Sequence, residues 1–406
     1  MSQFYRAAFA VIAPEVGAEL GLSAAALGLA SGAFFVALGV VQLPVGMLFD
    51  RYGPRRVIAA LTGLAVLGAL GHGGARGLGE LVASHVLLGL GCAGSFMGAV
   101  VLCGRWYGGE RFTTRLAWVF ALSNLGIVAA ATPLAVASAR LGWRWAFVGA
   151  AGLTAAVGAG FALLARDAPP GTAPAPAARE RLADVLGGLR AVWRTPGLAP
   201  VLAIHTFAYA SMLTVLGLWA GPYLWDVHGL DPLGRGHVLT AMSLAQVAGI
   251  LAYGPLDRLF NTRKWIIVPG AAASVALLAL LAALPRPPLG LAAALLVLLC
   301  LVSAYGVVIV AHGRSLFPDR LAGRGVTTVN LAQVAGTSFL PVLTGGVLSL
   351  VDAWRPGAAS LGYRAMFASI AVCLLAGLAG YSRAHDAPPR PARAADRRAT
   401  ATPPEA

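Results

Sequence analysis

Residues 46–56 read Gly46-Met47-Leu48-Phe49-Asp50-Arg51-Tyr52-Gly53-Pro54-Arg55-Arg56 and join two long apolar segments of the chain. Charged residues are costly inside a lipid bilayer, where an arginine at mid-depth costs about 2.5 to 3.5 kcal/mol. The stretch is therefore predicted to be a short surface loop. The apolar segments on both sides are predicted to be membrane-spanning helices, because a helix pairs its backbone groups within a single segment.

A looser copy of this loop lies at residues 254–264, with one residue fewer before its Asp-Arg pair and without the second glycine. Two other elements recur in the same order. Residues 104–115 share their spacing of Gly-Arg, acid-Arg and Arg with residues 313–324. The element Gly142-Trp143-Arg144 corresponds to Gly362-Tyr363-Arg364. The chain is therefore predicted to consist of two halves of one design.

The composition of the chain indicates the same class of protein. Hydrophobic residues make up 58% of the sequence, charged residues make up 11%, and the mean hydropathy is +0.77. A chain of this kind cannot bury its apolar side chains in one water-soluble core. We therefore expect an all-α membrane protein that is solvated by the lipid bilayer.

The positive charge is distributed as expected for membrane topology, and no nucleic-acid partner is predicted from the net charge of +14. When the loops are assigned alternately to two sides, 22 of the 30 Lys and Arg residues fall on one side and 7 on the other. By the positive-inside rule, the first side is cytoplasmic. This assignment places residues 46–56, a central linker and the C-terminus in the cytoplasm.

The spacing in residues 46–56 resembles the loop between the second and third helices of the major facilitator superfamily. That pattern is Gly, three residues, Asp-Arg, one residue, Gly, one residue and two basic residues, and every position matches. The resemblance implies two six-helix bundles related by pseudo-two-fold symmetry. Within the superfamily, Phe4-Tyr5-Arg6, Gly142-Trp143-Arg144 and the Gly-rich fourth helix are similar to one broad branch. It contains nitrate/nitrite porters, organic-anion and sugar-phosphate permeases, and lysosomal dipeptide carriers.

Four regions are expected along the chain. They are an N-terminal six-helix bundle (1–165), a cytoplasmic linker (166–197) with an amphipathic helix over 179–194, a C-terminal six-helix bundle (198–381) and a disordered cytoplasmic tail (382–406). After the first helix, the spans are expected at 25–48, 57–74, 78–102, 114–137, 143–164, 198–224, 237–259, 265–284, 289–312, 326–350 and 363–381.

The first helix is expected to be shortened. Pro14 and Glu15 follow after Met1 to Ala13, whereas about 20 apolar residues are needed to cross a bilayer. We expect either that the true start lies upstream or that this helix lacks a turn on its cytoplasmic side.

Polar side chains within the apolar segments are the candidates for substrate binding, because each is costly there. The seventh helix carries a stripe of polar and aromatic residues, and the eleventh carries two amides on one face. Isolated polar residues on other helices complete the set. The candidates are Arg6, His205, Tyr209, Trp219, Asn330, Gln333, Gln42, Asn124, Gln246 and Tyr305. Each residue alone also fits a role in helix packing.

Arg6 is the strongest candidate for holding an anionic group of a substrate. It shares a helical face with Ala10, Ala13 and Gly17, and a stripe of small residues is typical of a face that meets other helices. The alternative is that Arg6 lies near the shortened end of its helix and extends to the cytoplasmic interface. The sequence leaves both interpretations open.

The resemblance implies a conformational lock at the two loops. Asp50 is expected to pair with a neighbouring arginine and to close the cytoplasmic side in one state only. The predicted lock residues are Gly46, Asp50, Arg51, Gly53, Arg55, Arg56, Gly254, Asp257 and Arg258.

Proton coupling is predicted to depend on histidine, if it occurs. No Asp or Glu lies in the middle of a helix, whereas His85 occupies a position at which the family often has an arginine, and His205 lies on the seventh helix. No phosphate-binding loop, metal-ligand spacing or nucleophile elbow is evident. We therefore expect no enzyme activity, no cofactor and no metal site.

Together these features predict a multi-pass inner-membrane transporter that acts by alternating access. Its expected partners are a small polar solute, with an organic anion favoured, and optionally a proton. A monomer is expected. Two alternatives remain: a transporter-like membrane sensor, whose output surface would be residues 179–194, and a carrier of drugs or dipeptides.

Overall fold

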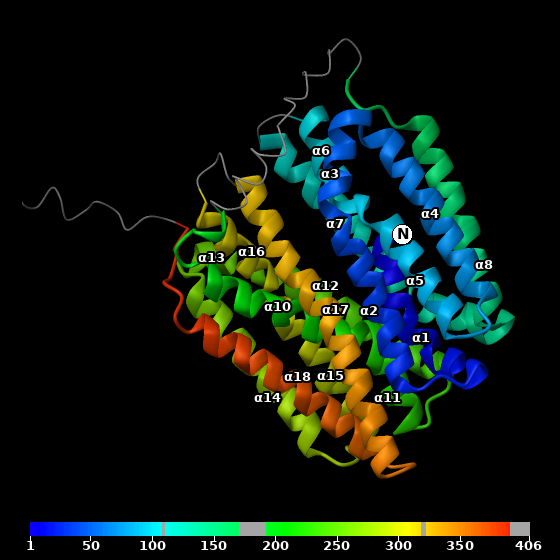
Figure 1. Cartoon of the computed structure of the whole chain (residues 1–406). Coiled ribbons are helices and arrows are strands. Elements are labelled where there is room, and N and C mark those ends of the chain that lie inside the picture. Colours follow the sequence, from blue (N-terminus) through cyan, green and yellow to red (C-terminus); the bar gives the residue numbers. More distant parts are fainter. Residues whose placement is uncertain (108–109, 170–191, 318–321, 390–406) are drawn as a thin grey trace, which may run out of the picture.

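The computed structural model describes residues 1–107, 110–169, 192–317 and 322–389. Within these residues the protein is helical and contains no strand. The helices form an N-terminal half, blue to blue-green in Figure 1, and a C-terminal half, green to red. The predicted all-α fold class is confirmed.

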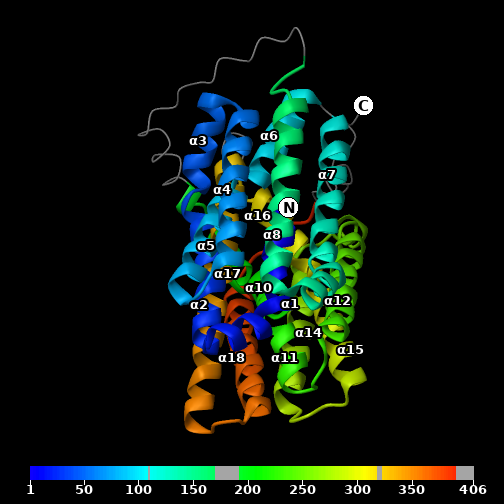
Figure 2. The same ribbon diagram turned by 90° about the vertical axis from the view of Figure 1, so that its right-hand side faces the viewer.

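The N-terminal half contains the helices that precede the central linker. They are α1 (Ser2–Leu20), α2 (Ala24–Val40), α3 (Gln42–Tyr52), α4 (Pro54–Gly74), α5 (Leu78–Cys92), α6 (Gly94–Trp106), α7 (Glu110–Ala129) and α8 (Thr132–Leu164). Within this half, α4 packs between α5 and α8. Figure 2 shows α3, α4, α6 and the upper part of α8 gathered at one end of the molecule.

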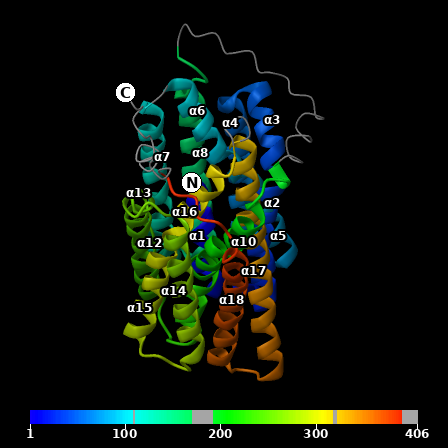
Figure 3. The ribbon, with the colours of Figure 1, turned by 90° about the vertical axis from the view of Figure 1, so that its left-hand side faces the viewer.

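The C-terminal half contains helices of very different lengths, and some short helices follow one another without a loop. They are α10 (Leu198–Thr214), η1 (Val215–Trp219), α11 (Ala220–Asp226), α12 (Pro232–Tyr253), α13 (Leu256–Leu259), α14 (Lys264–Ala283), α15 (Leu289–Val302), η2 (Ser303–Tyr305), α16 (Gly306–Ser315), α17 (Ala322–Trp354) and α18 (Ala359–Tyr381). α18 packs against α14 and α10, and Figure 3 shows it beside α17.

Nine helical segments of the described residues are long and apolar enough to cross a membrane. Some predicted spans are two helices instead of one. The span expected at 25–48 breaks at Val41, between α2 and α3, and the span expected at 78–102 breaks at Ala93. The span expected at 114–137 breaks between α7 and α8.

Glycine permits the sharp changes of direction in this bundle. α8 contains Gly142 with φ 80° and ψ 154°, where the fifth and sixth predicted spans meet. Gly53, which also has φ 80°, separates α3 from α4, and Pro54 then begins α4. A positive φ is easily adopted only by glycine, and proline is well suited to the first turn of a helix.

The predicted end of the first helix at Ala13 is wrong. α1 continues through Pro14 to Leu20, where Gly21 with φ 62° ends it. Its 19 residues correspond to about 28 Å at 1.5 Å per residue. The N-terminus nevertheless lies part-way along the N-terminal half and not at its end (Figures 1, 2 and 3). Arg6, which is half-buried, therefore does not lie at the end of this half.

The two halves meet along three sets of helices. α2 packs against α17, α1 packs against η1 and α11, and α8 packs against α12. The contact between α2 and α17 brings backbones together: a Cβ added to Gly28 would lie 2.2 Å from the carbonyl oxygen of Pro341, and one added to Gly345 would lie 2.5 Å from that of Ala24. Small residues allow this approach between membrane helices.

Two predicted regions differ from the structure or lie outside it. The amphipathic helix predicted over 179–194 falls almost entirely outside the described residues. The disordered tail was predicted to begin at residue 382, but residues 382–387 are held by hydrogen bonds to the start of α14. The boundary was wrong because these hydrogen bonds join residues more than a hundred positions apart.

Candidate functional site

The loop between α3 and α4 is held by an acidic residue that sequence analysis did not identify. Asp167, which follows α8, accepts a hydrogen bond of 2.7 Å from the backbone N–H of Arg55. Its carboxylate also lies against Gly53, where an added Cβ would approach Asp167 Oδ2 to 2.4 Å. The Arg55 guanidinium donates to the carbonyl of Ala162 at 2.7 Å. Asp167 therefore caps the positive end of α4.

The same arrangement occurs in the second half. Asp386, which follows α18, accepts hydrogen bonds from the backbone N–H groups of Arg263 and Lys264, both at 3.0 Å, and from the Thr262 hydroxyl at 2.5 Å. Burial by itself raises the pKa of the Asp386 carboxyl. These three donors, together with the backbone N–H of Ala387, outweigh this effect and hold the pKa below its usual value. Asp386 thus caps α14 as Asp167 caps α4.

A sequence signal for these caps exists. Residues 167–170 and residues 386–389 both read Asp-Ala-Pro-Pro. The short repeat follows the last helix of each half, at an offset similar to that of the two loops. It was overlooked because a four-residue match in Pro-rich sequence is weak until the structure shows what the aspartate contacts.

The predicted lock residues are only partly described. The side chain of Asp50 lies outside the described part of the structure, so its pairing stays a prediction. Arg51, Arg56 and Arg258 are exposed. Asp257 lies 3.4 Å from the guanidinium of Arg263. Gly46 and Gly254 would meet no side chain if a Cβ were added.

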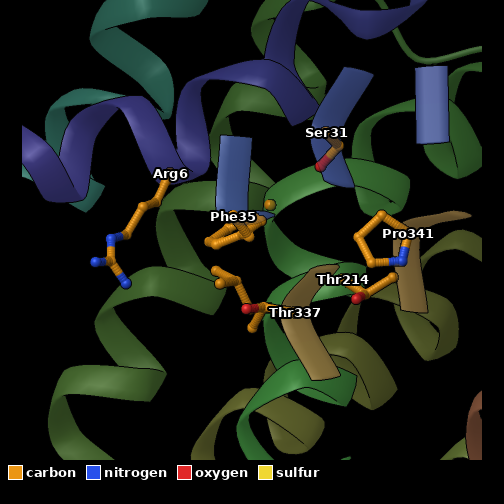
Figure 4. A pocket seen from close by; sticks show the side chains of 8 residues that line it. Arg6, Ser31, Phe35, Thr214, Thr337 and Pro341 are labelled. Atoms are coloured by element: carbon orange, nitrogen blue, oxygen red, sulfur yellow. The ribbon is translucent and has the colours of Figure 1, made fainter. Parts of the chain in front are cut away.

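A small pocket lies between the two halves, beside α1. Arg6 comes from α1, Ser31 and Phe35 from α2, Thr214 from the end of α10, and Thr337 from α17. Leu213, Gly217 and Pro341 complete the lining. Figure 4 shows Phe35 and Thr337 between Arg6 on one side and Thr214 and Pro341 on the other. The free volume of about 10 Å³ is room for about one water molecule.

Several polar atoms near this pocket have no hydrogen-bond partner within the described residues. They include Arg6 Nε, Thr214 Oγ1 and Ser211 Oγ, all buried. A buried donor without a partner costs free energy, so these atoms indicate a place where a ligand or water would be stabilised. The five-residue π-helix η1 follows Thr214 directly, and π-helical turns are frequent at functional sites.

Arg6 is the only one of the ten predicted binding residues that lines this pocket. His205 lies beside Gln333, although neither ring nitrogen makes a hydrogen bond of normal geometry. Trp219 donates from Nε1 to Thr344 at 2.8 Å, which indicates a packing role. The others are buried or half-buried elsewhere in the bundle: Tyr209, Asn330, Gln333, Gln42, Asn124, Gln246 and Tyr305.

The pocket hydroxyls were missed because serine and threonine are inconspicuous in apolar helices. Thr337 Oγ1 donates to the backbone of its own helix, at 3.0 Å from Val334 O, a bond that hides such residues in many membrane helices. Ser31 and Thr214 carried no pattern in the sequence.

An ion pair joins the halves at the end opposite the two loops. The fully buried side chain of Arg235, on α12, pairs with Glu15 on α1. Its Nη1 also lies 3.4 Å from the carbonyl oxygen of Val11, and its guanidinium is 5.0 Å from the Trp225 ring centre. Pro14 lacks an N–H and interrupts the hydrogen bonding of α1 at this level. Sequence analysis did not single out Arg235.

His85, the predicted proton-coupling residue, is buried in α5. It lies next to a second buried histidine, His72 of α4, with ring centres 5.0 Å apart. Sequence analysis did not single out His72. Within the described residues, no group of three or more His, Cys, Asp or Glu side chains could hold a metal ion.

Comparison with known proteins identifies relatives of the chain. The family model described as Major Facilitator Superfamily matches residues 1–234. A "Probable L-galactonate transporter" of Escherichia coli (strain K12) is 24% identical over 377 residues, which cover 86% of this chain and 81% of that protein.

Two further relatives match over shorter stretches. A "Probable sulfoacetate transporter" of Cupriavidus necator is 30% identical over 161 residues, covering 39% of this chain and 36% of that protein. A "Quinolone resistance transporter" of Acinetobacter baumannii is 30% identical over 158 residues, covering 37% and 36%.

Solved structures share the fold over nearly the whole chain. The crystal structure of a bacterial homolog to the human lysosomal transporter Spinster, inward-facing and unoccupied, has a TM-score of 0.78 at 18% identity and covers 94% of this chain and 93% of that one. The D-xylose-proton symporter has a TM-score of 0.74 at 14% identity and covers 95% of each chain. At these identities the likeness concerns the fold alone.

Proposed function

Because the chain belongs to the major facilitator superfamily, whose model matches residues 1–234, we propose that it carries a small organic anion across a membrane by alternating access. The relatives are transporters of small solutes, and the nine apolar helical segments of the described residues fit a multi-pass membrane protein. The predicted membership of this superfamily is confirmed.

The position of Arg6 is the observation that supports an anion as the substrate. Its side chain lines a pocket between the halves, and none of the described residues that line the pocket with it is acidic. A guanidinium away from bulk water is stabilised by an anionic partner, and its planar donors match a carboxylate, sulfonate or phosphate. The Ser31, Thr214 and Thr337 hydroxyls nearby would bind further oxygens of the same solute.

The names of two relatives support this class of substrate. L-galactonate carries a carboxylate and several hydroxyls, and sulfoacetate carries a carboxylate and a sulfonate. Both are small anions rich in oxygen. A site with one guanidinium and three hydroxyls suits such solutes better than cations or apolar drugs.

Alternating access is supported by the way in which the halves meet. α2 and α17 touch through backbone at Gly28 and Gly345, and Glu15 pairs with Arg235 across the halves. These contacts lie away from the loops capped by Asp167 and Asp386. A pocket between two such units can open to either side when the units rock against each other.

The finer features of the transporter are part of the proposal. We place it in the inner membrane as a monomer, with the C-terminus in the cytoplasm, where most basic residues of its loops would lie. The proposal also includes the conformational lock at Asp50 and the coupling of transport to proton movement through a histidine. His85 and His205 are its two candidate groups.

Ligand-induced thermal stabilisation of the purified protein tests the proposal. L-galactonate and sulfoacetate are the anionic probes, and D-xylose is the neutral one. We expect an anion to raise the melting temperature of the wild type, and Arg6→Gln to weaken its affinity about 10-fold or more, because a hydrogen bond to a charged group contributes about 1.5 to 3 kcal/mol. Arg286→Gln, at an exposed loop position, serves as the matched control.

A response to D-xylose alone, or an anion response that survives in Arg6→Gln, would overturn the anion site. Drug transport is a second candidate, because the quinolone resistance transporter is 30% identical over 158 residues. Stabilisation by a quinolone in both wild type and Arg6→Gln would favour that candidate.

A further inference from the structure

Two buried histidines lie side by side in the N-terminal half. His72, near the end of α4, is 0% exposed, and His85 of α5 is 5% exposed. The ring centres are 5.0 Å apart and the rings are tilted by 55°. Neither ring lines the pocket at Arg6, so the pair is a separate feature of the molecule.

Aromatic rings from two other helices enclose the pair. Phe147 of α8 stacks on His72 with centres 4.0 Å apart and 18° between planes. Phe9 of α1 meets His85 edge-on at 4.7 Å and His72 at 6.0 Å. Trp143 of α8 meets His72 edge-on at 5.8 Å. The two histidines and the rings around them thus come from four helices, α1, α4, α5 and α8.

The hydrogen bonds of the pair are incomplete. Nδ1 of His85 lies 3.0 Å from the Leu81 carbonyl oxygen. It therefore carries the hydrogen, and Nε2 keeps a lone pair. Neither nitrogen of His72 has a partner among the described residues. A neutral imidazole always retains one N–H, so His72 presents a buried donor without an acceptor. Since neither nitrogen of His72 makes a hydrogen bond to His85, the two rings can share a hydrogen through one water or after a small rotation of one ring.

The charged residues around the two histidines lie near the end of α4 and the turn between α4 and α5. Arg144 of α8 donates to the carbonyl of Gly73, the residue after His72, to the carbonyl of Ala75 and to Glu19. Glu19 of α1 is about half exposed. α2, which packs on α5, carries no titratable side chain. Arg76 and Glu80, at the turn between α4 and α5, contact each other through Arg76 N–H.

We propose that His72 and His85 form a proton-binding site that holds one proton between the two imidazoles. The added proton lies between the lone-pair nitrogen of His72 and Nε2 of His85, while the N–H on the other nitrogen of His72 stays in place. Trp143 lies between the site and Glu19, because its Nε1 donates to Glu19 at 2.5 Å while its ring meets His72 edge-on. Uptake is therefore expected from the end of the molecule that carries Glu19.

The same pair can pass its charge state to the solute pocket. Phe9 touches both imidazoles and lies three residues after Arg6 on α1. A positive charge on the imidazoles would change their interaction energy with the Phe9 ring. Since Phe9 is on α1, α1 is the helix whose position would change. This coupling rests on the proposed transport function, whereas the binding of a proton does not.

Fluorescence of Trp143 tests the proton site without a substrate. A protonated imidazole in contact with an indole quenches it. We expect a pH-dependent step in the wild type that is absent from Trp143→Phe, and we expect it below about pH 6.5, the usual pKa of histidine. We expect the step to be lost in both His72→Phe, which retains an aromatic ring against Phe147, and His85→Gln. His312→Gln, at a buried histidine of the other half, should keep it.

Two results would overturn the site. One is that the fluorescence of the wild type shows no pH-dependent step that is lost in Trp143→Phe. This result does not depend on whether the histidine variants fold. The other is a step that disappears in His72→Phe but persists unchanged in His85→Gln, since the proton would then belong to one ring.

Flux in proteoliposomes separates this site from the transport proposal. With sulfoacetate as probe, uptake that rises with an inward proton gradient in the wild type and not in His72→Phe supports coupling. Uptake that ignores the gradient overturns the coupling and leaves the fluorescence step unaffected. A fluorescence step with no flux of any anion probe counts against the transport proposal instead.

Discussion

At the scale of single residues, buried charge marks the functional places in this protein. Arg6 and Arg235 both have guanidinium atoms within the bundle, but their surroundings differ. Arg235 has its anion in the protein, at Glu15. Arg6 Nε has no partner among the described residues. The same chemical group therefore serves as a link between halves in one position and as a candidate ligand site in the other.

Removal of the Arg235 charge should destabilise the protein strongly. Loss of one partner of a buried ion pair typically costs about 3 to 5 kcal/mol, because the other charge is left without compensation. We expect Arg235→Met to lower the melting temperature clearly. The double variant Arg235→Met with Glu15→Gln should lose less than the sum of the single variants. Thermal melts of the detergent-solubilised variants measure both effects.

The matched control is Glu19→Gln, whose carboxylate pairs with Arg144 but is 49% exposed. Exposed pairs contribute about 0 to 1 kcal/mol. If Arg235→Met were no more destabilising than Glu19→Gln, the buried pair would not be the link that we describe.

At the scale of elements, each half repeats one device. An aspartate a few residues after the last helix of each half caps the start of an earlier helix of that half: Asp167 caps α4 and Asp386 caps α14. A cap on the first turn satisfies backbone N–H groups that a helix cannot pair itself. The last helix and the loop of each half are thereby held together and can move as one unit.

Loss of either cap should loosen only its own loop. Replacing an N-terminal capping residue by alanine costs about 0.5 to 2 kcal/mol. We expect Asp167→Ala to speed amide hydrogen exchange at the start of α4, and Asp386→Ala to do so at the start of α14. Asparagine at either position should retain most of the protection. Asp352→Ala, in the last turn of α17 at the opposite end of the molecule, should change neither. Equal loosening of both loops by one variant would contradict separate caps.

The Asp386 cap should also depend on pH. Its pKa is lower in the folded protein than its usual value, so the unfolded chain binds more protons between the two pKa values. The contribution of the cap is therefore fully present above about pH 4, the usual range for aspartate, and is lost as the pH falls through the folded pKa.

The difference in melting temperature between wild type and Asp386→Asn measures this dependence. We expect the difference to be constant from neutral pH down to about pH 4 and to shrink at lower pH. A difference that grows as the pH falls would show that the carboxylate is not the stabilising form.

At the scale of the whole molecule, the arrangement of the halves depends on the contact between α2 and α17. A Cβ on Gly28 would lie 2.2 Å from a backbone oxygen, a distance that side-chain movement cannot relieve. The helices would have to separate. Since a transporter of this kind works by rocking its halves, such a change should shift the balance between its two states.

Gly28→Ala is expected to open the end of the molecule that carries the Glu15–Arg235 pair. The shift is measured as the distance between spin labels placed on α2 and α17 at this same end of the molecule. We expect the population with the longer distance to dominate in the variant. Gly346→Ala is the control, because an added Cβ there meets nothing within 4 Å although Gly345 beside it is packed. Equal distances in Gly28→Ala and Gly346→Ala would contradict a tight contact.

Much of the candidate site could not be predicted from the sequence. Arg6 was found because a charge in an apolar helix is conspicuous. Ser31 and Thr214 were missed because a hydroxyl in an apolar helix is common. His72 was missed because a lone histidine near a helix end has no meaning until His85 is seen beside it. Trp219 was predicted as a binding residue, but its indole is engaged by Thr344.

The sequence alone determined the class of protein, the positions of most helices and the division into two halves. These depend on local quantities, namely the hydropathy of each segment, the charge of each loop and the conformational limits of glycine and proline. Only the tertiary structure decided which polar groups meet. Glu15 and Arg235, or Arg55 and Asp167, are far apart in the chain, and their contact depends on how whole helices pack, which no local pattern records.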